Sequence, residues 1–369
     1  MAIRRQSNSD YMSREMDKEL EEMERSIHTL YQDADTELRR RLSDYLSQYE
    51  EDNQDMRERL ENGDISQEEY ERWANSRIIR SQRYERQIDA LADVLVNTDV
   101  AAMALVNENL PAVIGNSYNF IASLGFRAAE EAGLSVGNFQ IYNASSVQML
   151  IRENPDILPV VDVPEDERWN RSRINREVTQ SIIQGDTIPQ VADRLQRVTN
   201  MDNNAAVRNA RTAMTASENM GRAQASRRLR DAGVPNREVW SATMDNRTRD
   251  THLLLDGTYA NEDGYFGEGI LHPDHLMRFP ADPNGEPQEV YNCRCRLSIQ
   301  LEGIDHSQDG DLYRQFMEEN YPDDYASLQA RDEETGRTQR RQEAINRTPQ
   351  ARERVQSNLE ERLRLERRG

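Results

Sequence analysis

The sequence predicts a mostly α-helical protein with one small α+β module in its C-terminal half. The chain has 369 residues, of which only 36% are hydrophobic and 31% are charged. Its mean hydropathy of -0.93 suits long helices that each bury a single stripe. Apolar residues recur at steps of three and four over most of the first 232 residues. After residue 236 the composition changes, and glycines, prolines, aromatic residues and both cysteines gather in a short stretch.

Residues 1–154 are predicted to form a region of long helices. Apolar side chains follow helical spacing over residues 20–60, and the Asn62–Gly63 pair ends this helix. Ser66 together with Glu69 makes a capping box that opens a second long helix. Two long helices joined by a short turn predict an antiparallel hairpin.

The helical part of the chain continues on both sides of a predicted linker. Residues 99–133 are rich in Ala, Leu, Val and Phe, and we interpret them as a buried helical core rather than a membrane-contacting segment. Residues 155–166 hold three prolines and predict an irregular linker. Three helices are predicted after it, at 169–184, 187–198 and 203–232. One face of the last helix carries only small residues, which predicts tight packing against a neighbouring backbone.

The module at residues 237–301 is predicted to hold two strands and one short helix. The strands are expected at 239–243 and 290–299, and the helix at 249–256. Together with the helices that precede it (169–232), the module makes up a predicted domain at 167–301.

Composition excludes several classes of protein. The formal net charge of -20 argues against a general coat for nucleic acid, because phosphate would be repelled on average. No stretch is apolar enough to span a bilayer, and the N-terminus has no apolar signal core, which predicts synthesis in a cytoplasm. The sequence has only two cysteines, and this excludes a disulfide framework.

The basic residues are almost all arginine, since Lys18 is the only lysine among 47. GC-rich coding explains this bias without a function, and we prefer it to selection for arginine pairing with carboxylate or phosphate. Residues 302–369 are predicted to form a charged tail that is helical or disordered. Its almost purely polar end at 331–369 is either a solvated helix or disordered until a partner binds. Any DNA contact is expected in this tail, at Arg340, Arg341, Arg352, Arg354, Arg367 and Arg368.

A series of motifs in the module points to a known family. In chain order the residues are Trp240, Asp245, Arg247, Thr248, Arg249, His252, Asp256, Gly257, Asn292, Cys293, Arg294 and Cys295. This order resembles the head-morphogenesis domain of the phage Mu F-like minor head proteins. That domain carries a tryptophan strand, a D-x-R-T-R-x-x-H turn and helix, a D-G stop, a P-G-D-P turn and a terminal N-C-R-C.

The resemblance covers about residues 170–301, and Ala210-Arg211-Thr212 matches the A-R-T signature of the family. One departure lies in the P-G-D-P turn, where Ala281 stands in place of the glycine. Because glycine alone reaches some turn conformations without strain, this departure predicts a different turn type.

The resemblance implies a structural minor head protein of a tailed bacteriophage, without catalytic activity. It implies a few copies per virion near the portal, made in the host cytoplasm, with a role in head assembly, DNA packaging or ejection. The expected partners are the portal protein, the major capsid or scaffolding protein, and packaged DNA, without stable membrane insertion. Some relatives carry a C-terminal ADP-ribosyltransferase domain, for which residues 302–369 are too few and too charged.

Charged residues of the motif allow two interpretations. Asp245, Arg247, Arg249 and Asp256 could be an acid/base set, but we prefer a lattice of paired charges that holds a glycine-rich loop. No nucleophile elbow and no phosphate-binding glycine loop occurs in the sequence.

The cysteines and histidines of the module suggest a structural zinc site. Cys293, Cys295 and His252 are the expected ligands, with His272 or His275 as the fourth. A flat strand would hold the two thiols too far apart, so the chain must bend between them. Two buried free thiols are the alternative interpretation.

An enzyme is the alternative from a different functional class. A metal-dependent nuclease or hydrolase would use His252, His272, Asp274 and His275. We prefer to interpret the His-Pro-Asp-His sequence at residues 272–275 as a polar turn.

Overall fold

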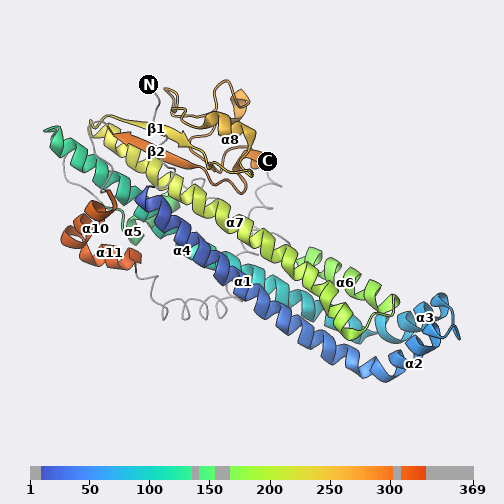
Figure 1. Cartoon of the computed structure of the whole chain (residues 1–369). Coiled ribbons are helices and arrows are strands. Elements are labelled where there is room, and N and C mark those ends of the chain that lie inside the picture. Colours follow the sequence, from blue (N-terminus) through green and yellow to red (C-terminus); the bar gives the residue numbers. More distant parts are fainter. Residues whose placement is uncertain (1–9, 135–140, 154–166, 302–308, 330–369) are drawn as a thin grey trace, which may run out of the picture. The chain divides into compact units, whose positions relative to one another are not determined.

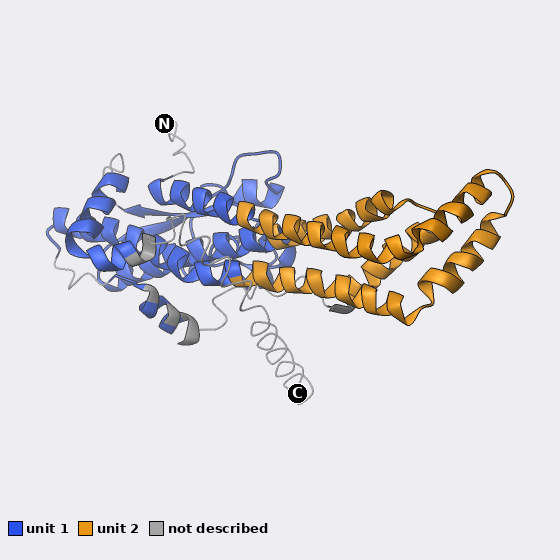
Figure 2. Ribbon diagram, turned by 90° about the horizontal axis from the view of Figure 1, so that it is seen from below, with its two compact units in different colours: residues 1–24, 105–161, 208–340 blue, residues 25–104, 162–207, 341–369 orange. Residues whose placement is uncertain are grey.

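A computed structural model describes residues 10–134, 141–153, 167–301 and 309–329 of the chain. Its described residues are mainly helical, with one two-stranded sheet (Figure 1). The fold therefore agrees with the mostly α prediction. The chain divides into two compact units (Figure 2). Unit 1 comprises residues 1–24, 105–161 and 208–340, and unit 2 comprises residues 25–104, 162–207 and 341–369.

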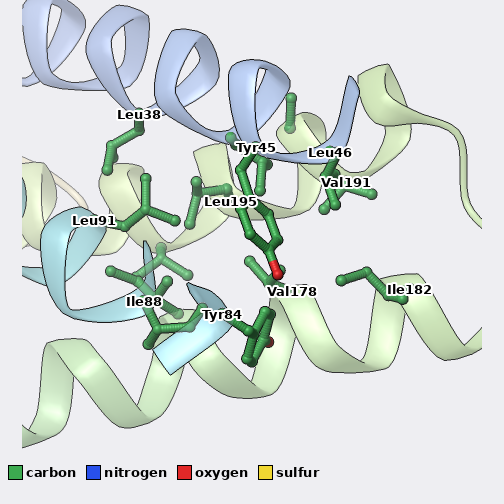
Figure 3. Close-up of a cluster of buried hydrophobic side chains, with 14 of the residues drawn as sticks. Leu38, Tyr45, Leu46, Tyr84, Ile88, Leu91, Val178, Ile182, Val191 and Leu195 are labelled. Atoms are coloured by element: carbon green, nitrogen blue, oxygen red, sulfur yellow. The ribbon is translucent and has the colours of Figure 1, made fainter. Parts of the chain in front are cut away.

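Unit 2 is a bundle of helices with one apolar core. Five elements lie wholly in unit 2: η1 (Ser47–Tyr49), α2 (Glu50–Glu61), α3 (Gln67–Ala74), a π-helical turn η2 (Asn75–Ile79) and α6 (Glu167–Ile183). Three longer helices contribute one part each: α1 (Tyr11–Leu46) from residue 25 onward, α4 (Gln82–Glu131) up to residue 104, and α7 (Ile188–Asp231) up to residue 207. Leu38 and Tyr45 of α1 meet Ile88 of α4, Val178 of α6 and Leu195 of α7 in this core (Figure 3). Each is buried because its helix presents an apolar stripe at helical spacing.

The predicted turn between the first two helices is confirmed, and Gly63 adopts a φ of 78° there. The capping box is also confirmed, since the Glu69 amide donates to Ser66 Oγ and the Ser66 amide donates to Glu69 Oε2. Both predicted helices are interrupted. The first is divided by η1 into α1 and α2, and in the second α3 runs into η2 before α4 starts at Gln82. The Ser81 hydroxyl accepts the Tyr84 amide at 3.0 Å and so caps this new start.

Two predicted helices are in fact one. The expected break between residues 198 and 203 is wrong, because α7 continues without interruption from Ile188 to Asp231. Residues 199–202 contain neither glycine nor proline, and Thr199 and Asp202 are buried. Packing therefore favours the helical conformation over these polar residues.

Unit 1 contains the sheet and the rest of α4 and α7. Strands β1 (Asn236–Ser241) and β2 (Arg296–Leu301) pair in antiparallel fashion, with Trp240 opposite Leu297. The other elements are α5 (Ala144–Glu153), α8 (Asp250–Leu255), η4 (Pro273–His275), α9 (Pro287–Val290), α10 (Asp309–Asn320) and α11 (Pro322–Gln329). The predicted short helix is α8, and Gly257 after it has a φ of 75°.

The small-residue face of α7 packs tightly against α4 in unit 1. A Cβ built on Gly221 would lie 2.5 Å from the carbonyl oxygen of Ile114 and 3.1 Å from the amide nitrogen of Tyr118. Ala210, Ala213 and other small residues of this face are fully buried. The prediction of close backbone packing at this face is thus confirmed.

Three details of the module differ from expectation. The first strand is Asn236–Ser241 rather than 239–243. The second strand begins at Arg296 rather than at Val290, because α9 ends at Val290 and Asn292 takes a left-handed φ of 59°. Ala281 also adopts a left-handed φ, of 61°. The missing glycine therefore does not remove the glycine-type backbone at this position, although an alanine there costs about 1–2 kcal/mol.

Helices α10 and α11 lie in the predicted tail at 302–369, and there they agree with its helical alternative. Tyr313 and Met317 of α10 are buried, and the Tyr313 ring lies edge-on to Phe120 of α4. Arg127 of α4 forms an ion pair with Asp309 at 2.7 Å. No described helix is long and apolar enough to cross a membrane. The predicted linker at 155–166 and the tail at 331–369 lie outside the described residues.

Candidate functional site

The terminal Asn-Cys-Arg-Cys motif is held by the Arg-Thr pair of α7. The Asn292 amide donates to Thr212 Oγ1 at 2.8 Å, and Arg211 Nη1 donates to Asn292 Oδ1 at 3.0 Å. Arg211 also pairs with Glu24 of α1 at 2.5 Å. Asn292 tolerates the left-handed conformation, and these contacts fix it there. Two signature motifs 80 residues apart thus form one contact.

The turn before α8 grips the same loop from another element. Arg294 lies between the two cysteines, and its Nη1 and Nη2 donate to the two carboxylate oxygens of Asp245. The Asp245 carboxylate also accepts the Arg247 amide at 2.9 Å. Thr243 Oγ1 donates to the Arg294 carbonyl at 2.6 Å, and Arg249 Nη2 donates to the Tyr291 carbonyl at 2.5 Å. These bonds connect the turn to the loop at several points.

The remaining motif residues have structural contacts as well. Asp256 Oδ1 accepts the Ala242 amide at 2.9 Å, which ties the end of α8 to the end of β1. Hydrogen bonds from Arg294 hold the pKa of Asp245 well below its usual range. A carboxylate with so low a pKa is a poor proton acceptor at neutral pH. The geometry therefore favours the lattice of paired charges over an acid/base set.

The bend between the cysteines brings both thiols to one histidine. His252 Nδ1 lies 3.6 Å from Cys293 Sγ and 3.3 Å from Cys295 Sγ, and all three side chains are about 1% exposed. Each residue offers a ligand atom within 4.8 Å of the other two. In a tetrahedral zinc site, Zn–S bonds of about 2.3 Å and Zn–N bonds of about 2.0–2.1 Å place sulfur and nitrogen roughly 3.6 Å apart. The observed nitrogen–sulfur distances match this edge, so the residues fit such an ion.

The Glu289 carboxylate lies close to Nε2, the second ring nitrogen of His252. Its Oε2 lies 3.1 Å from His252 Nε2, close enough for an ion pair, although the two groups are not aligned as a hydrogen bond. The same oxygen accepts the Thr251 hydroxyl at 2.8 Å. Metal-bound histidines commonly direct their second nitrogen to a carboxylate, which fixes the ring orientation. The arrangement at His252 has this form.

The two thiols have different proton affinities. The hydrogen bond from Cys293 and the contact with His252 lower the pKa of Cys295 to about 5. The bond to Cys295, together with burial, raises the pKa of Cys293 above its usual range. The lowered pKa of Cys295 favours its thiolate, which is the form of cysteine that binds a metal.

The other two predicted ligands lie elsewhere in the module. His272 and His275 are at least 40% exposed and contact each other, with ring centroids 5.1 Å apart. His272 approaches Asp274, and His275 Nε2 lies 2.9 Å from Glu286. Among the described residues, the potential metal-binding group contains neither of them. The interpretation of residues 272–275 as a polar turn agrees with the 3-10 turn η4.

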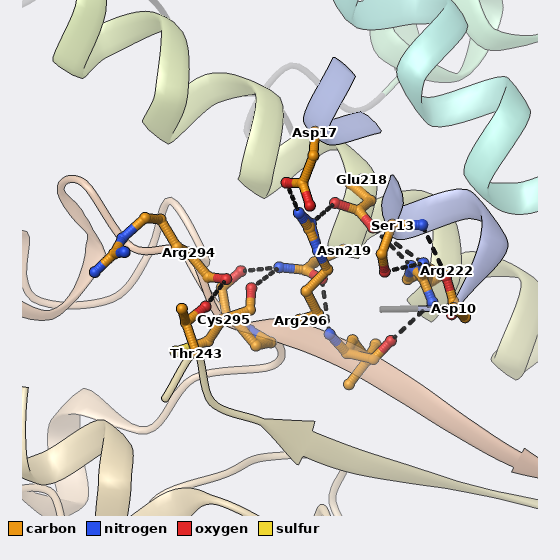
Figure 4. Close-up of polar contacts among 12 residues, drawn as sticks. Asp10, Ser13, Asp17, Glu218, Asn219, Arg222, Thr243, Arg294, Cys295 and Arg296 are labelled. Carbon is orange, nitrogen blue, oxygen red and sulfur yellow. Dashed lines mark hydrogen bonds and ion pairs between the residues drawn. The ribbon is translucent and has the colours of Figure 1, made fainter. Parts of the chain in front are cut away.

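A buried network of charges, which the sequence analysis missed, fastens the site to the start of α1 (Figure 4). Arg222 of α7 donates to Asp10 at 2.7 Å and 2.9 Å and to Glu218 at 3.0 Å. Arg296 of β2 contacts Glu218 at 2.5 Å and also pairs with Asp17. The only sequence signal was a glutamate and an arginine four residues apart within a helix of small residues.

Asn219 extends this network to the cysteine loop. Its amide nitrogen donates to the carbonyls of Pro280 at 2.9 Å and Cys295 at 3.0 Å, and its oxygen accepts the Leu297 amide at 2.8 Å. Burial would raise the pKa of Asp10, but the charge of Arg222 lowers it well below its usual range. One face of α7 therefore positions the loop, β2 and the first turn of α1 together.

Comparison with known proteins identifies the region that carries the site. Residues 172–298 match the family described as "Phage Mu protein F like protein". The chain is 27% identical over 235 residues to the minor head protein GP7 of Bacillus phage SPP1. The matched region covers 61% of this chain and 71% of that protein. No solved structure matches the chain significantly.

A second relative is an enzyme. The chain is 27% identical over 138 residues to the NAD(+)–arginine ADP-ribosyltransferase EFV of Enterococcus faecalis. This match covers 36% of the chain and spans only 27% of that protein. So short a span carries no argument for the same activity here.

Proposed function

Because residues 172–298 match the phage Mu F-like family and the chain is similar to a phage minor head protein, we propose that it is a minor head protein that binds the portal of a tailed phage head. A structural role in the head follows from the family. The portal contact, and a part in head assembly, DNA packaging or ejection, are our proposal. The major capsid or scaffolding protein is a second expected partner. The protein would then be made in the host cytoplasm and kept in the virion.

The mutual contacts of the signature residues support this structural role. Arg211 and Thr212 bind Asn292, Asp245 binds Arg294, and these bonds hold the loop that carries the two cysteines. Such a lattice is suited to a rigid surface for another protein. We therefore propose no catalytic activity.

Binding to the portal can be tested by co-expression with the cognate portal protein. We expect a complex that survives size-exclusion chromatography at micromolar concentration. A charge-reversed Lys18→Glu variant, altered at an exposed side chain of α1, is a control for non-specific electrostatic association. Elution of the two proteins as separate species would refute the portal assignment.

We also propose that His252, Cys293 and Cys295 hold one structural zinc ion. Zinc would join α8 to the loop before β2, and such sites contribute about 10 kcal/mol or more to folding in small modules. Three protein ligands leave one position, where catalytic zinc sites carry water. Burial of all three side chains argues against substrate reaching that position. The metal-dependent nuclease or hydrolase is therefore the weaker candidate.

Elemental analysis of protein purified without added metal tests the zinc proposal. We expect about one zinc per chain, lost in Cys293→Ser/Cys295→Ser. The His272→Asn/His275→Asn variant is a matched control, and it should keep its metal. Metal-free protein whose melting temperature ignores chelator would refute the proposal, and metal-dependent DNA cleavage would favour the nuclease.

Contact of the tail with packaged DNA is a further part of the proposed function. The arginines at 340, 341, 352, 354, 367 and 368 lie in the stretch of residues 331–369. Deletion of this stretch should weaken DNA binding and reduce its dependence on salt. Unchanged affinity would contradict the proposal.

A further inference from the structure

A pocket between the end of α7 and the start of β1 has the features of a binding site, and the proposed role in the phage head does not involve it. Its volume is about 610 Å³, within the range of sites for small ligands. The last turns of α7, the start of β1 and the loop 259–265 line it, together with Arg278. All of these elements belong to unit 1.

The loop side of the pocket is pre-organised. Asn261 Oδ1 accepts the amides of Asp263 at 3.1 Å and Tyr265 at 2.9 Å, and the Asn261 amide donates to the Tyr265 carbonyl. Gly264 supplies the left-handed residue of this turn, with a φ of 82°. Tyr259 pairs with Val239 of β1 through an isolated bridge. A ligand would therefore meet a formed surface, which lowers the entropic cost of binding.

Four arginines line the pocket, and two of them have a carboxylate partner. Arg230 pairs with Glu238 at 3.1 Å, and Arg278 forms a two-point pair with Asp282. For Arg227 and Arg237, the described part of the chain provides no ion pair. Arg227 only contacts a backbone carbonyl of its own helix, and the Arg237 guanidinium lies 5.5 Å from the centre of the Tyr259 ring. Two cationic forks are thus available to an anion.

Aromatic rings complete the chemistry of the pocket. Tyr259 and Tyr265 both line it, and they are 50% and 38% exposed. Exposed rings beside arginines are the elements with which proteins bind nucleotides: the guanidinium meets the phosphate and the ring stacks on the base. Glu262 and Asp263 also line the pocket and would repel phosphate, so the phosphate is expected at the two unpaired arginines.

We propose that this pocket binds a nucleoside phosphate, through Arg227 and Arg237 for the phosphate and Tyr259 and Tyr265 for the base. The same chemistry occurs in a free nucleotide and in one unit of a single DNA strand. None of the residues that line this pocket belongs to the tail at 331–369, so variants of the pocket test it independently of the proposed tail contact and of the portal role.

Fluorescence anisotropy of the full chain with labelled oligo-dT, and calorimetry with AMP, test the proposal. Arg227→Gln/Arg237→Gln should lose about tenfold or more in affinity. On oligo-dT, its log–log salt slope should become shallower by roughly 0.7–1.4. The control Arg208→Gln/Arg228→Gln removes the same charge from exposed positions of α7 outside the pocket, and its affinity should stay within about twofold of the wild type.

A variant of opposite sign makes the test sharper. Glu262→Gln/Asp263→Asn should tighten binding, because it removes two negative charges from the pocket. Response to AMP as well as oligo-dT would indicate a free nucleotide, and response to oligo-dT alone would indicate a strand; both support the site. Equal affinities of the pocket variant and its control would overturn the proposal. Binding of polyglutamate without any binding of either nucleotide probe would also overturn it, since it would indicate an acidic peptide.

Discussion

The most informative perturbation of this protein is the removal of Arg222. Its side chain is 1% exposed and bonds to Asp10, Glu218, the Ser13 hydroxyl and the Leu297 carbonyl. Arg222→Met replaces the guanidinium by an apolar side chain of similar length. It leaves Glu218 buried with Arg296 as its remaining charged partner. Loss of one partner from a buried ion pair costs about 3–5 kcal/mol.

Urea denaturation measures this cost in unit 1. Trp240 is fully buried in β1, so its fluorescence reports on unit 1 once Trp73 and Trp169 of unit 2 are replaced by phenylalanine. We expect the Arg222→Met variant to lose about 3–5 kcal/mol in free energy of unfolding. The exposed Arg208, on the same helix, is the matched control, and Arg208→Met should change stability by less than about 0.5 kcal/mol.

A double variant separates the charge from the packing. Arg222→Met/Glu218→Gln removes the charge of the stranded carboxylate, whose pKa burial already raises. We expect it to recover at least about 1 kcal/mol relative to Arg222→Met. A loss of less than about 1 kcal/mol in the free energy of unfolding of Arg222→Met would show that the buried ion pairs do not stabilise unit 1. A double variant less stable than Arg222→Met would show that the unpaired Glu218 charge is not the source of the loss.

Three further substitutions in unit 1 should change its stability or its affinity for metal. Gly221→Ala should lower the free energy of unfolding of unit 1 by about 1–2 kcal/mol, because the new Cβ meets the backbone of α4. Gly125→Ala is the control and should cost less, because its Cβ meets only the Leu229 side chain. Equal losses of stability in urea denaturation would show that contact with the α4 backbone is not the cause. Glu289→Gln should weaken zinc affinity about 10–100-fold, as measured by competition with a chelator. Glu286→Gln, which removes the carboxylate beside His275, is the control and should leave zinc affinity unchanged. Unchanged affinity in Glu289→Gln would show that Glu289 does not orient His252. The lowered pKa of Asp245 means that its pairing stabilises the protein fully above its unfolded pKa of about 4 and is lost as pH falls through the lower folded pKa. The fall in melting temperature between pH 7 and pH 3 should therefore be smaller in Asp245→Asn, and an equal fall in both proteins would contradict this assignment.

Local signals in the sequence predicted many of the element ends correctly. The Ser66 capping box, the glycines at 63 and 257 and the apolar stripes of α1 and α4 act over a few residues, so their effect can be read directly. The small-residue face of α7 belongs to the same class, since close approach needs only the absence of side-chain volume. The predicted break after residue 198 failed because burial outweighed the weak helix preference of polar residues.

The candidate site was predicted only in part, because its geometry depends on contacts over long sequence distances. Residue types alone selected His252, Cys293 and Cys295, but the left-handed Asn292 and the start of β2 at Arg296 provide the bend that joins the two thiols. His272 and His275 share that chemistry, yet the chain places them on an exposed turn.

The sequence by itself determined the helical class, the resemblance of residues 172–298 to the phage Mu F-like family, and the set of thiol and imidazole groups. Tertiary structure alone decided which carboxylate stands behind His252 and which acids neutralise Arg222, as Asp10 lies 212 residues away in sequence. Helix periodicity and capping are properties of neighbouring residues. Charge pairing in a protein interior depends on which side chains are buried together, because a low local dielectric makes each unpaired charge costly.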